Sequence, residues 1–296
     1  MTTLLGLLLL AGPTAAEGEG SPATDTEPHT SSVHLKSGRE IVVFPANNLY
    51  PLYIADPHSP ATGILIQSFT TTGIAQAGNQ RFFLKLGGQF GLLRWQPRNP
   101  GGRAWQLSLD AGLDAQFDID NRNDNIGWDG NYGLSSTTAR QGGKVVWKLG
   151  ILHTSSHLGD EWIKRTGRER INYTRQEALV GMSWRFAPRW RTYSEAGWGY
   201  DLSSDEMEPG RLQAGLDYRV PGRFWGGIGG WYAALDLSSW GERDGRLDTG
   251  FQGGLIISGA GNTWRLGIQY WDGRVPVGEF FQDTESNFTL GLWSEL

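Results

Sequence analysis

From about residue 61 onward, apolar and polar side chains alternate along the chain, most clearly in the run 105–119. One face of this run comprises Trp105, Leu107, Leu109, Ala111, Leu113, Ala115, Phe117 and Ile119. The other face carries the carboxylates Asp110, Asp114 and Asp118. A period of two predicts a β-strand with two different faces. The run exceeds the roughly five or six residues of a common soluble strand, so it predicts a tilted strand with lipid outside and water inside.

The same alternation recurs to the C-terminus and predicts about twelve strands. The expected strands are 61–72, 80–95, 103–119, 126–138, 144–157, 171–186, 189–203, 210–220, 223–238, 246–258, 262–272 and 284–296. Short connections at 187–189, 221–222 and 259–262 are typical of the periplasmic side of such barrels, and the longer polar ones belong outside. The fold class expected is therefore an all-β, antiparallel transmembrane β-barrel with both termini in the periplasm.

A soluble β-sandwich or a lipocalin-like barrel would show the same alternation, with its apolar face buried. Strand length, the 14 tryptophans and the asymmetry of the connections favour the membrane barrel. The 43 glycines argue against a helical protein, because glycine costs about 1 kcal/mol per helix position relative to alanine. A net charge of −5 gives no reason to expect nucleic acid as a partner, and the absence of cysteine excludes disulfides and thiol chemistry.

The N-terminal part differs from the alternating region. Residues 1–16 contain an apolar run followed by small residues, which predicts a signal peptide. Residues 17–60 are expected to be a disordered linker, rich in Ser, Thr, Pro, Gly and Glu, followed by a proline-rich periplasmic extension from residue 41. Its prolines exclude a central strand, so we expect it to pack against the barrel mouth or enter it. Residues 61–296 form the barrel.

The face predicted to point inward carries both signs of charge. Its charged residues are Lys85, Asp110, Asp114, Asp118, Lys148, Glu177, Arg185, Arg191, Glu195, Arg211, Asp217, Arg219 and Arg265. In one interpretation these groups pair across the lumen and make the barrel rigid. The interior of a membrane barrel is polar whatever the function of the protein, so this pairing does not require a pore. In the other, Arg185, Arg191, Arg211, Arg219 and Arg265 form a basic ladder that binds anions or sugar acids in a narrow pore.

The run 144–161 ends in three chemically capable side chains on one face, His153, Ser155 and His157. Residues i and i+2 of a strand share a face, so His153 could take the proton of Ser155 as a general base. A polar group on the adjacent strand would hold the imidazole, and Asn172 is the first candidate, ahead of Glu169 and Glu177. This hypothesis makes the protein an outer-leaflet lipid acyl hydrolase.

Plainer interpretations of this run stand beside the catalytic one. His157, Asp160 and Glu161 are expected to fix the outer loop through hydrogen bonds or to contact a ligand such as lipopolysaccharide. With His153 they are also residue types that bind Zn²⁺ or Ca²⁺. Their spacing meets no metal-site rule, so neither a metal nor a cofactor is expected.

Three stretches carry a wider resemblance: FPANNLYPLYIADP (44–57), HTSSHLGDEW (153–162) and RINYTRQEAL (170–179). They are similar to an uncharacterised family of Gram-negative outer-membrane proteins, a domain of unknown function. The resemblance implies a porin-like barrel of the cell envelope, which meets outer-membrane lipids, lipopolysaccharide and the barrel-assembly machinery. The expected role is structural or that of a narrow pore.

The pair His153 and Ser155 carries a second, smaller resemblance. A His-x-Ser in a barrel of about twelve strands resembles outer-membrane phospholipase A and lipid A deacylase. In the phospholipase, Asn-Gly follows the serine directly, whereas here Ser156 and His157 follow it. The resemblance implies the alternative function, acyl hydrolysis with Ser155 as nucleophile.

Overall fold

The computed structural model describes residues 32–35, 38–99, 101–258 and 263–295. The expected signal peptide, most of the linker and the expected turn at 259–262 lie outside the described residues. Most of the described chain is antiparallel sheet. None of its helices is long and apolar enough to cross a membrane.

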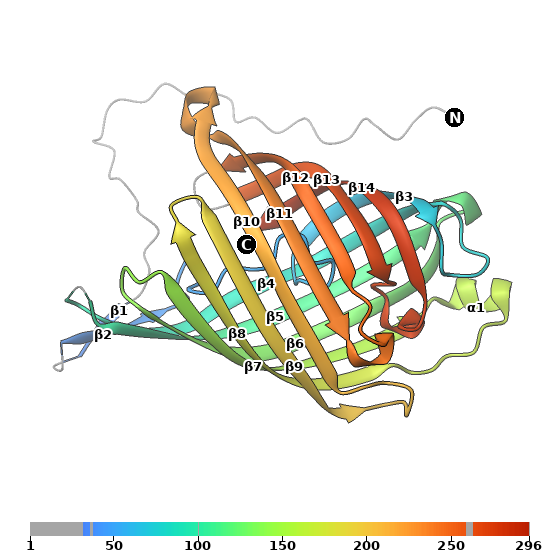
Figure 1. Cartoon of the computed structure of the whole chain (residues 1–296), viewed down its shortest axis with the longest axis horizontal. Coiled ribbons are helices and arrows are strands. Elements are labelled where there is room, and N and C mark those ends of the chain that lie inside the picture. The colour runs from blue at the N-terminus through green and yellow to red at the C-terminus, as the bar shows by residue number, and fades with distance from the viewer. Residues whose placement is uncertain (1–31, 36–37, 100, 259–262, 296) are drawn as a thin grey trace, which may run out of the picture.

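Twelve strands close into a barrel, as predicted (Figure 1). They are β3 (Thr62–Thr71), β4 (Gln80–Pro97), β5 (Arg103–Asp118), β6 (Asp124–Arg140), β7 (Val145–Leu158), β8 (Thr174–Ala187), β9 (Trp190–Leu202), β10 (Gly210–Phe224), β11 (Gly229–Trp240), β12 (Asp248–Ser258), β13 (Thr263–Arg274) and β14 (Thr284–Glu295). Each pairs with its neighbour in sequence, and β14 closes the ring on β3, with Leu290 opposite Ile66. Closure removes the free edges that an open sheet would expose.

The connections divide the barrel into two ends. One end, the long-loop end, carries the helix α1 (Asp160–Thr166) and three short 3₁₀ turns. These turns are η1 (Ile119–Asn121), η3 (Gly241–Arg243) and η4 (Gly278–Phe280). The opposite end, the short-turn end, includes the tight reversal between Ala187 and Trp190, which pair directly.

The expected turn at 221–222 is wrong. Strand β10 continues past Pro221 to Phe224, and the chain reverses at η2 (Trp225–Gly227). Pro221 lacks an N–H and interrupts the ladder, which becomes irregular between Val220 and Phe224 without ending the strand. Gly226 and Gly227 adopt positive φ angles of 66° and 97°, which supply the reversal instead.

The sheet extends beyond the twelve strands of the barrel. Ser32–His34 form strand β1, which pairs with β2 (Arg39–Val43). Strand β2 in turn pairs with the end of β4, with Val43 opposite Leu93. Ile41, Val42 and Val43 are all β-branched, which favours a strand, so this stretch extends the sheet before the first proline, Pro45, is reached.

The exposure of the strands distinguishes the two barrel types considered from sequence. Apolar side chains point outward, and Leu149, Leu212 and Ile268 are 62%, 65% and 60% exposed. Charged side chains point inward, and Arg81 and Asp118 are fully buried. A soluble barrel would bury its apolar face, so this arrangement is that of a membrane barrel.

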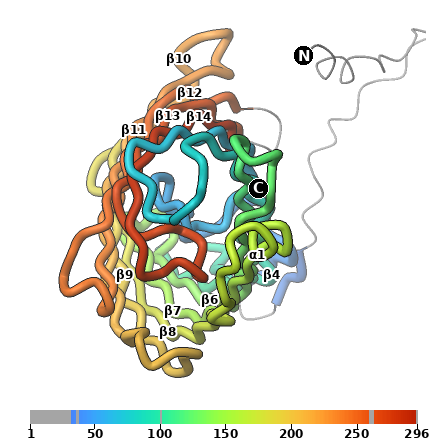
Figure 2. The backbone as a smooth tube through the Cα atoms, turned by 90° about the vertical axis from the view of Figure 1, so that its right-hand side faces the viewer, coloured from blue at the N-terminus to red at the C-terminus, as the bar shows by residue number. Residues whose placement is uncertain are grey.

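The proline-rich residues 45–61, here called the plug segment, lie inside the barrel. Figure 2 looks along the barrel and shows this blue segment crossing the ring of strands. Tyr50, Ile54 and Ala55 are 1%, 4% and 0% exposed. Of the two positions expected for this segment, the structure shows the one inside the lumen.

Candidate functional site

The plug segment is fixed to the barrel wall through its backbone. Arg191 of β9 donates hydrogen bonds from Nη1 to the Pro51 carbonyl at 2.8 Å and from Nη2 to the Leu52 carbonyl at 2.6 Å. Its Nε donates to Asp217 Oδ2 at 2.6 Å. One guanidinium therefore holds two consecutive plug carbonyls against strands β9 and β10, the fork geometry to which arginine is suited.

Two plug tyrosines reach deeper into the lumen. The Tyr53 hydroxyl donates to Glu195 Oε2 at 2.7 Å, and it lies 3.0 Å from the Tyr50 hydroxyl. The Tyr53 ring stacks on Tyr193 with 4.1 Å between ring centroids. Buried phenols normally satisfy their hydroxyl in this way, so the plug segment is both packed and hydrogen-bonded.

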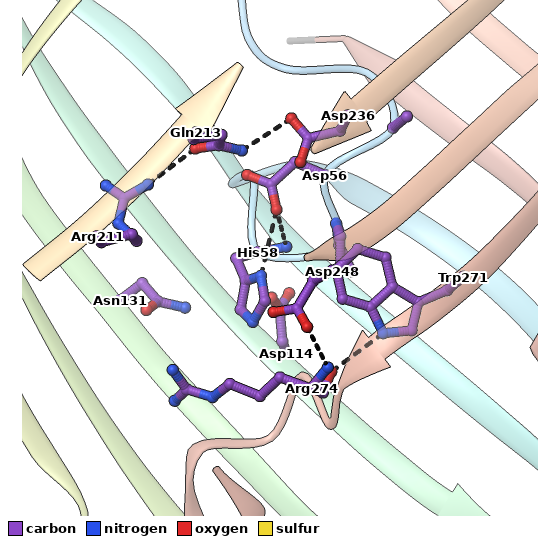
Figure 3. A network of polar contacts seen from close by, with 12 residues as sticks. Asp56, His58, Asp114, Asn131, Arg211, Gln213, Asp236, Asp248, Trp271 and Arg274 are labelled. Carbon is purple, nitrogen blue, oxygen red and sulfur yellow. Dashed lines mark hydrogen bonds and ion pairs between the residues drawn. The ribbon is translucent and has the colours of Figure 1, made fainter. Parts of the chain in front are cut away.

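Beyond the tyrosines, Asp56 and His58 form a second anchor (Figure 3). Asp56 Oδ1 accepts the His58 backbone N–H at 2.8 Å and lies 3.2 Å from His58 Nδ1. Burial alone would raise the pKa of Asp56, but the hydrogen bonds from His58 lower it to about 2. The carboxylate is therefore ionised at neutral pH and orients the imidazole. The His58 ring lies between Trp240 and Trp271, at centroid distances of 5.8 and 6.2 Å.

Side chains of the barrel wall donate further hydrogen bonds to carbonyls of the plug segment. Lys85 Nζ donates to the Pro57 carbonyl and to Asp114 Oδ2, both at 2.6 Å. Gln269 Nε2 donates to the Ala55 carbonyl at 3.1 Å. A buried segment without secondary structure needs such partners for its backbone, and here they come from β4 and β13, on either side of the seam between β14 and β3.

The charges of the lumen pair with one another. Arg211 binds Glu177 Oε1 at 2.5 Å and Glu195 Oε1 at 2.7 Å, and Arg191 pairs with Asp217. Arg265 donates to Gln252. Arg185 lies exposed at the short-turn end, and Arg219 is partly exposed. Carboxylates therefore neutralise two of the five arginines considered as a basic ladder from sequence, Arg191 and Arg211.

An apolar cap covers the lumen at the long-loop end. Its members are buried to 2% exposure or less and comprise Ile74, Ile126, Leu158, Trp162, Val275, Val277 and Phe280. Asp129 in the wall accepts the Gly278 N–H at 3.1 Å, and Ser156 Oγ accepts the Glu279 N–H at 2.9 Å. The cap therefore lies at the long-loop end of the lumen and is hydrogen-bonded to the barrel wall.

The residues proposed for catalysis lie on the outside of β7. His153 follows the exposed Leu149 and Ile151 on the outward face, and its ring lies 4.5 Å from that of Tyr132. His153 Nδ1 lies 2.7 Å from Nε2 of Gln176, the residue opposite it on β8. An amide turned by 180° would place Oε1 there as an acceptor. The imidazole therefore contacts a polar group of the adjacent strand, Gln176, which is not among the residues expected at this position.

Asn172 is not that residue. It is exposed in the loop before β8, with a left-handed φ of 52°, and the register places Thr174 opposite Ser155. The loop between β7 and β8 includes Asn172, which a tighter hairpin would have placed opposite Ser155. The pairing expected from sequence is therefore wrong, and Thr174 takes that position. Within the described residues, no hydrogen bond joins Ser155 Oγ to His153.

The other residues of this run separate. His157 packs its ring 4.5 Å from Trp128 on the outward face. Asp160 accepts a hydrogen bond from Arg170 at 2.7 Å, and Glu161 is exposed on α1. Across the described part of the chain, no group of three or more His, Cys, Asp or Glu side chains is placed to hold a metal ion.

Sequence reasoning missed two sets of residues. The sequence does not single out Gln176, because the residue opposite it depends on the register of β7 and β8, and the length of the loop between them sets that register. Asp56 and His58 lie within the stretch predicted to be an extension. An acid and a histidine two residues apart among prolines are the signal there for a polar, enclosed environment.

The closed ring, the apolar outer face and the polar lumen define a twelve-stranded barrel of the outer-membrane type. The chain belongs to the family DUF1207, described as a protein of unknown function, whose family model matches residues 14–293. The predicted membership of an uncharacterised barrel family is thereby confirmed.

Two solved structures with TM-scores of 0.50 or more show the same fold at low sequence identity. Outer membrane phospholipase A from Escherichia coli is 12% identical, with a TM-score of 0.53, and the match covers 79% of this chain and 93% of that chain. The Salmonella typhi outer membrane phospholipase dimer with bound calcium is 14% identical, with a TM-score of 0.50 and coverage of 84% and 94%. The KdgM porin is 7% identical, with a TM-score of 0.42 and coverage of 80% and 99%. No curated protein matches the chain.

Proposed function

We propose that the protein is an integral barrel of the outer membrane, with both termini in the periplasm and a structural role in which its own plug segment closes the lumen. It does not act as an open porin in this state, and a narrow pore would form only if the plug segment left. In this proposal its partners are outer-membrane lipids, lipopolysaccharide and the barrel-assembly machinery.

The observation that carries the proposal is the plug segment itself. Its carbonyls accept hydrogen bonds from Arg191, Lys85 and Gln269 on different strands. Each such bond contributes about 1 kcal/mol, and those from charged donors about 1.5 to 3 kcal/mol. A flexible linker would not hold its carbonyls against side-chain donors of several different strands. The plug segment is therefore an ordered part of the closed barrel.

Labelling of a cysteine placed at Ala55 tests this proposal. Ala55 is fully buried in the plug segment, and the chain has no cysteine of its own. We expect Ala55→Cys in folded protein to react with a water-soluble maleimide at least about 100-fold more slowly than Val33→Cys, whose site is 57% exposed. Equal rates at the two positions in folded protein would overturn the closed lumen.

A second function, acyl hydrolysis of lipid at the outer wall, is favoured by the contact between His153 and Gln176. With the Gln176 amide turned so that its Oε1 accepts the Nδ1–H of His153 across the 2.7 Å contact, Nε2 of His153 takes the proton of Ser155 as the serine Oγ attacks an ester carbonyl. The proton then passes to the departing alkoxide, and water hydrolyses the acyl-enzyme to free fatty acid. The outward face beside Leu149 and Ile151 is where a lipid ester would meet these groups.

Release of fatty acid from phospholipid or lipid A in mixed micelles checks this second function. Ser155→Ala and His153→Ala should each lower release by at least about 100-fold. Gln176→Leu should lower kcat by about 10-fold or more and shift the pH profile, whereas Gln176→Glu should retain activity because it keeps an acceptor on Nδ1. Asn172→Ala serves as the control and should match the wild type. Absence of release, or release that persists in Ser155→Ala, would exclude the hydrolase.

A further inference from the structure

Part of the inner wall departs from the polar character of the lumen. Leu152 of β7 and Leu179 of β8 point inward, since their neighbours Ile151 and Val180 are 54% and 44% exposed on the outside. Leu179 lies opposite Gly150, and a Cβ at Gly150 would come within 3.1 Å of its Cδ1. Two inward leucines beside a glycine give the lumen a local apolar surface.

These leucines are only partly buried although they lie inside a closed barrel. The surface that they retain faces a cavity of about 120 Å³, which separates them from Tyr50 and Leu52 of the plug segment. An engineered apolar cavity of about 150 Å³ holds a molecule the size of benzene. The cavity is of the same order, so it suits a small ligand of about that size, with a hydrocarbon part against Leu152 and Leu179.

Carboxyl groups outnumber cationic groups around the cavity, with six against four: Asp56, Asp110, Asp114, Asp129, Glu177 and Glu195 against Lys148, Arg175, Arg211 and Arg274. Lys148 and Arg211 both border the cavity, and each is engaged by Glu195. Asp110 also borders it and is only partly buried. It accepts Gln89 Nε2 at 2.8 Å and interacts electrostatically with Lys148, but it forms no ion pair within 4 Å in the described ranges. A carboxylate without an ion-pair partner beside an apolar surface favours a cationic head group.

We propose that the lumen cavity binds a compact amphiphilic amine, whose ammonium group meets Asp110 and whose alkyl chain lies against Leu152 and Leu179. Asn131 and Thr154 border the same cavity. Their side chains are hydrogen-bonded to each other at 2.8 Å and place further acceptor oxygens near the head group. The site goes beyond the structural role and rests on the closed lumen of the proposed function.

Calorimetric titration of the full chain in lipid nanodiscs with n-hexylamine tests the site, with n-hexanoate and n-hexanol as matched probes. We expect saturable binding of hexylamine at one site, at least 10-fold weaker binding of hexanol and none of hexanoate. Asp110→Asn should weaken hexylamine by at least 10-fold. Leu152→Phe should abolish binding by filling the cavity, whereas Ile151→Phe, the outward neighbour, should leave it unchanged.

Equal heats for wild type and Leu152→Phe would show partition into lipid and overturn the site, as would equal binding of hexanoate. Circular dichroism and labelling of Ala55→Cys accompany each titration. If the cysteine stays protected and hexylamine does not bind, this inference alone fails. If the cysteine reacts rapidly in folded protein, the closed barrel fails with it.

Discussion

Replacing Arg81 with methionine is expected to lower the free energy of unfolding by about 3–5 kcal/mol. Arg81 and Glu285 are both fully buried, and Arg81 Nη1 lies 2.9 Å from Glu285 Oε2. The pair links β4 to β14 past the intervening β3 and so spans the seam where the barrel closes. The substitution leaves a buried carboxylate without its cation, which costs far more than the pair itself contributes. Equilibrium unfolding in urea measures the difference.

Two controls separate this effect from a general loss of charge. The double variant Arg81→Met, Glu285→Met removes both charges and should recover most of the lost stability. Arg170→Met breaks the exposed pair with Asp160, whose side chains are 41% and 75% exposed, and should change stability by less than about 1 kcal/mol. A loss below about 1 kcal/mol for Arg81→Met would contradict a role for the buried pair in closing the barrel.

Arg191→Met is expected to loosen the plug segment and make the barrel conduct. The substitution removes the donors to the Pro51 and Leu52 carbonyls and the partner of Asp217. Buried carbonyls without donors and an unpaired carboxylate destabilise the plugged state relative to one in which water enters. Single-channel recording in planar bilayers should show brief openings that the wild type lacks.

The matched control is Arg185→Met. Arg185 borders the same opening at the short-turn end as Arg191, and it carries the same charge. It is exposed, and none of the plug contacts described above involves it. This variant should remain as silent as the wild type. Equal conductance in the two variants would show that charge at the mouth, and not the anchor of the plug segment, sets the permeability.

Most of the barrel follows from local sequence. Alternation is strict wherever lipid-facing and lumen-facing positions differ in polarity, so strands such as β5 and β7 were predicted to within a few residues. The prediction was wrong at Pro221. A proline usually marks a turn, but here it only interrupts the hydrogen-bond ladder, and the strand continues beyond it. The extension of the sheet by β1 was missed because three residues hold too little pattern to distinguish from a linker.

The site was less predictable, because its geometry depends on pairs far apart in sequence. The outward placement of His153 followed from period two, but its partner Gln176 depended on the length of the loop that follows β7. The prolines of the plug segment excluded a strand, yet nothing local to Tyr53 indicates that it will meet Glu195 across the lumen. Charges of both signs were consistent with either a pore or a paired interior, and only their contacts separate the two.

The central claim is that the barrel is closed by its own plug segment. The most direct test is the single-channel conductance of the purified wild-type protein in planar bilayers at neutral pH. We predict insertion without steady conductance, with openings only after the plug segment is loosened by Arg191→Met. A stable, open channel in the wild type, unchanged by that substitution, would contradict the account.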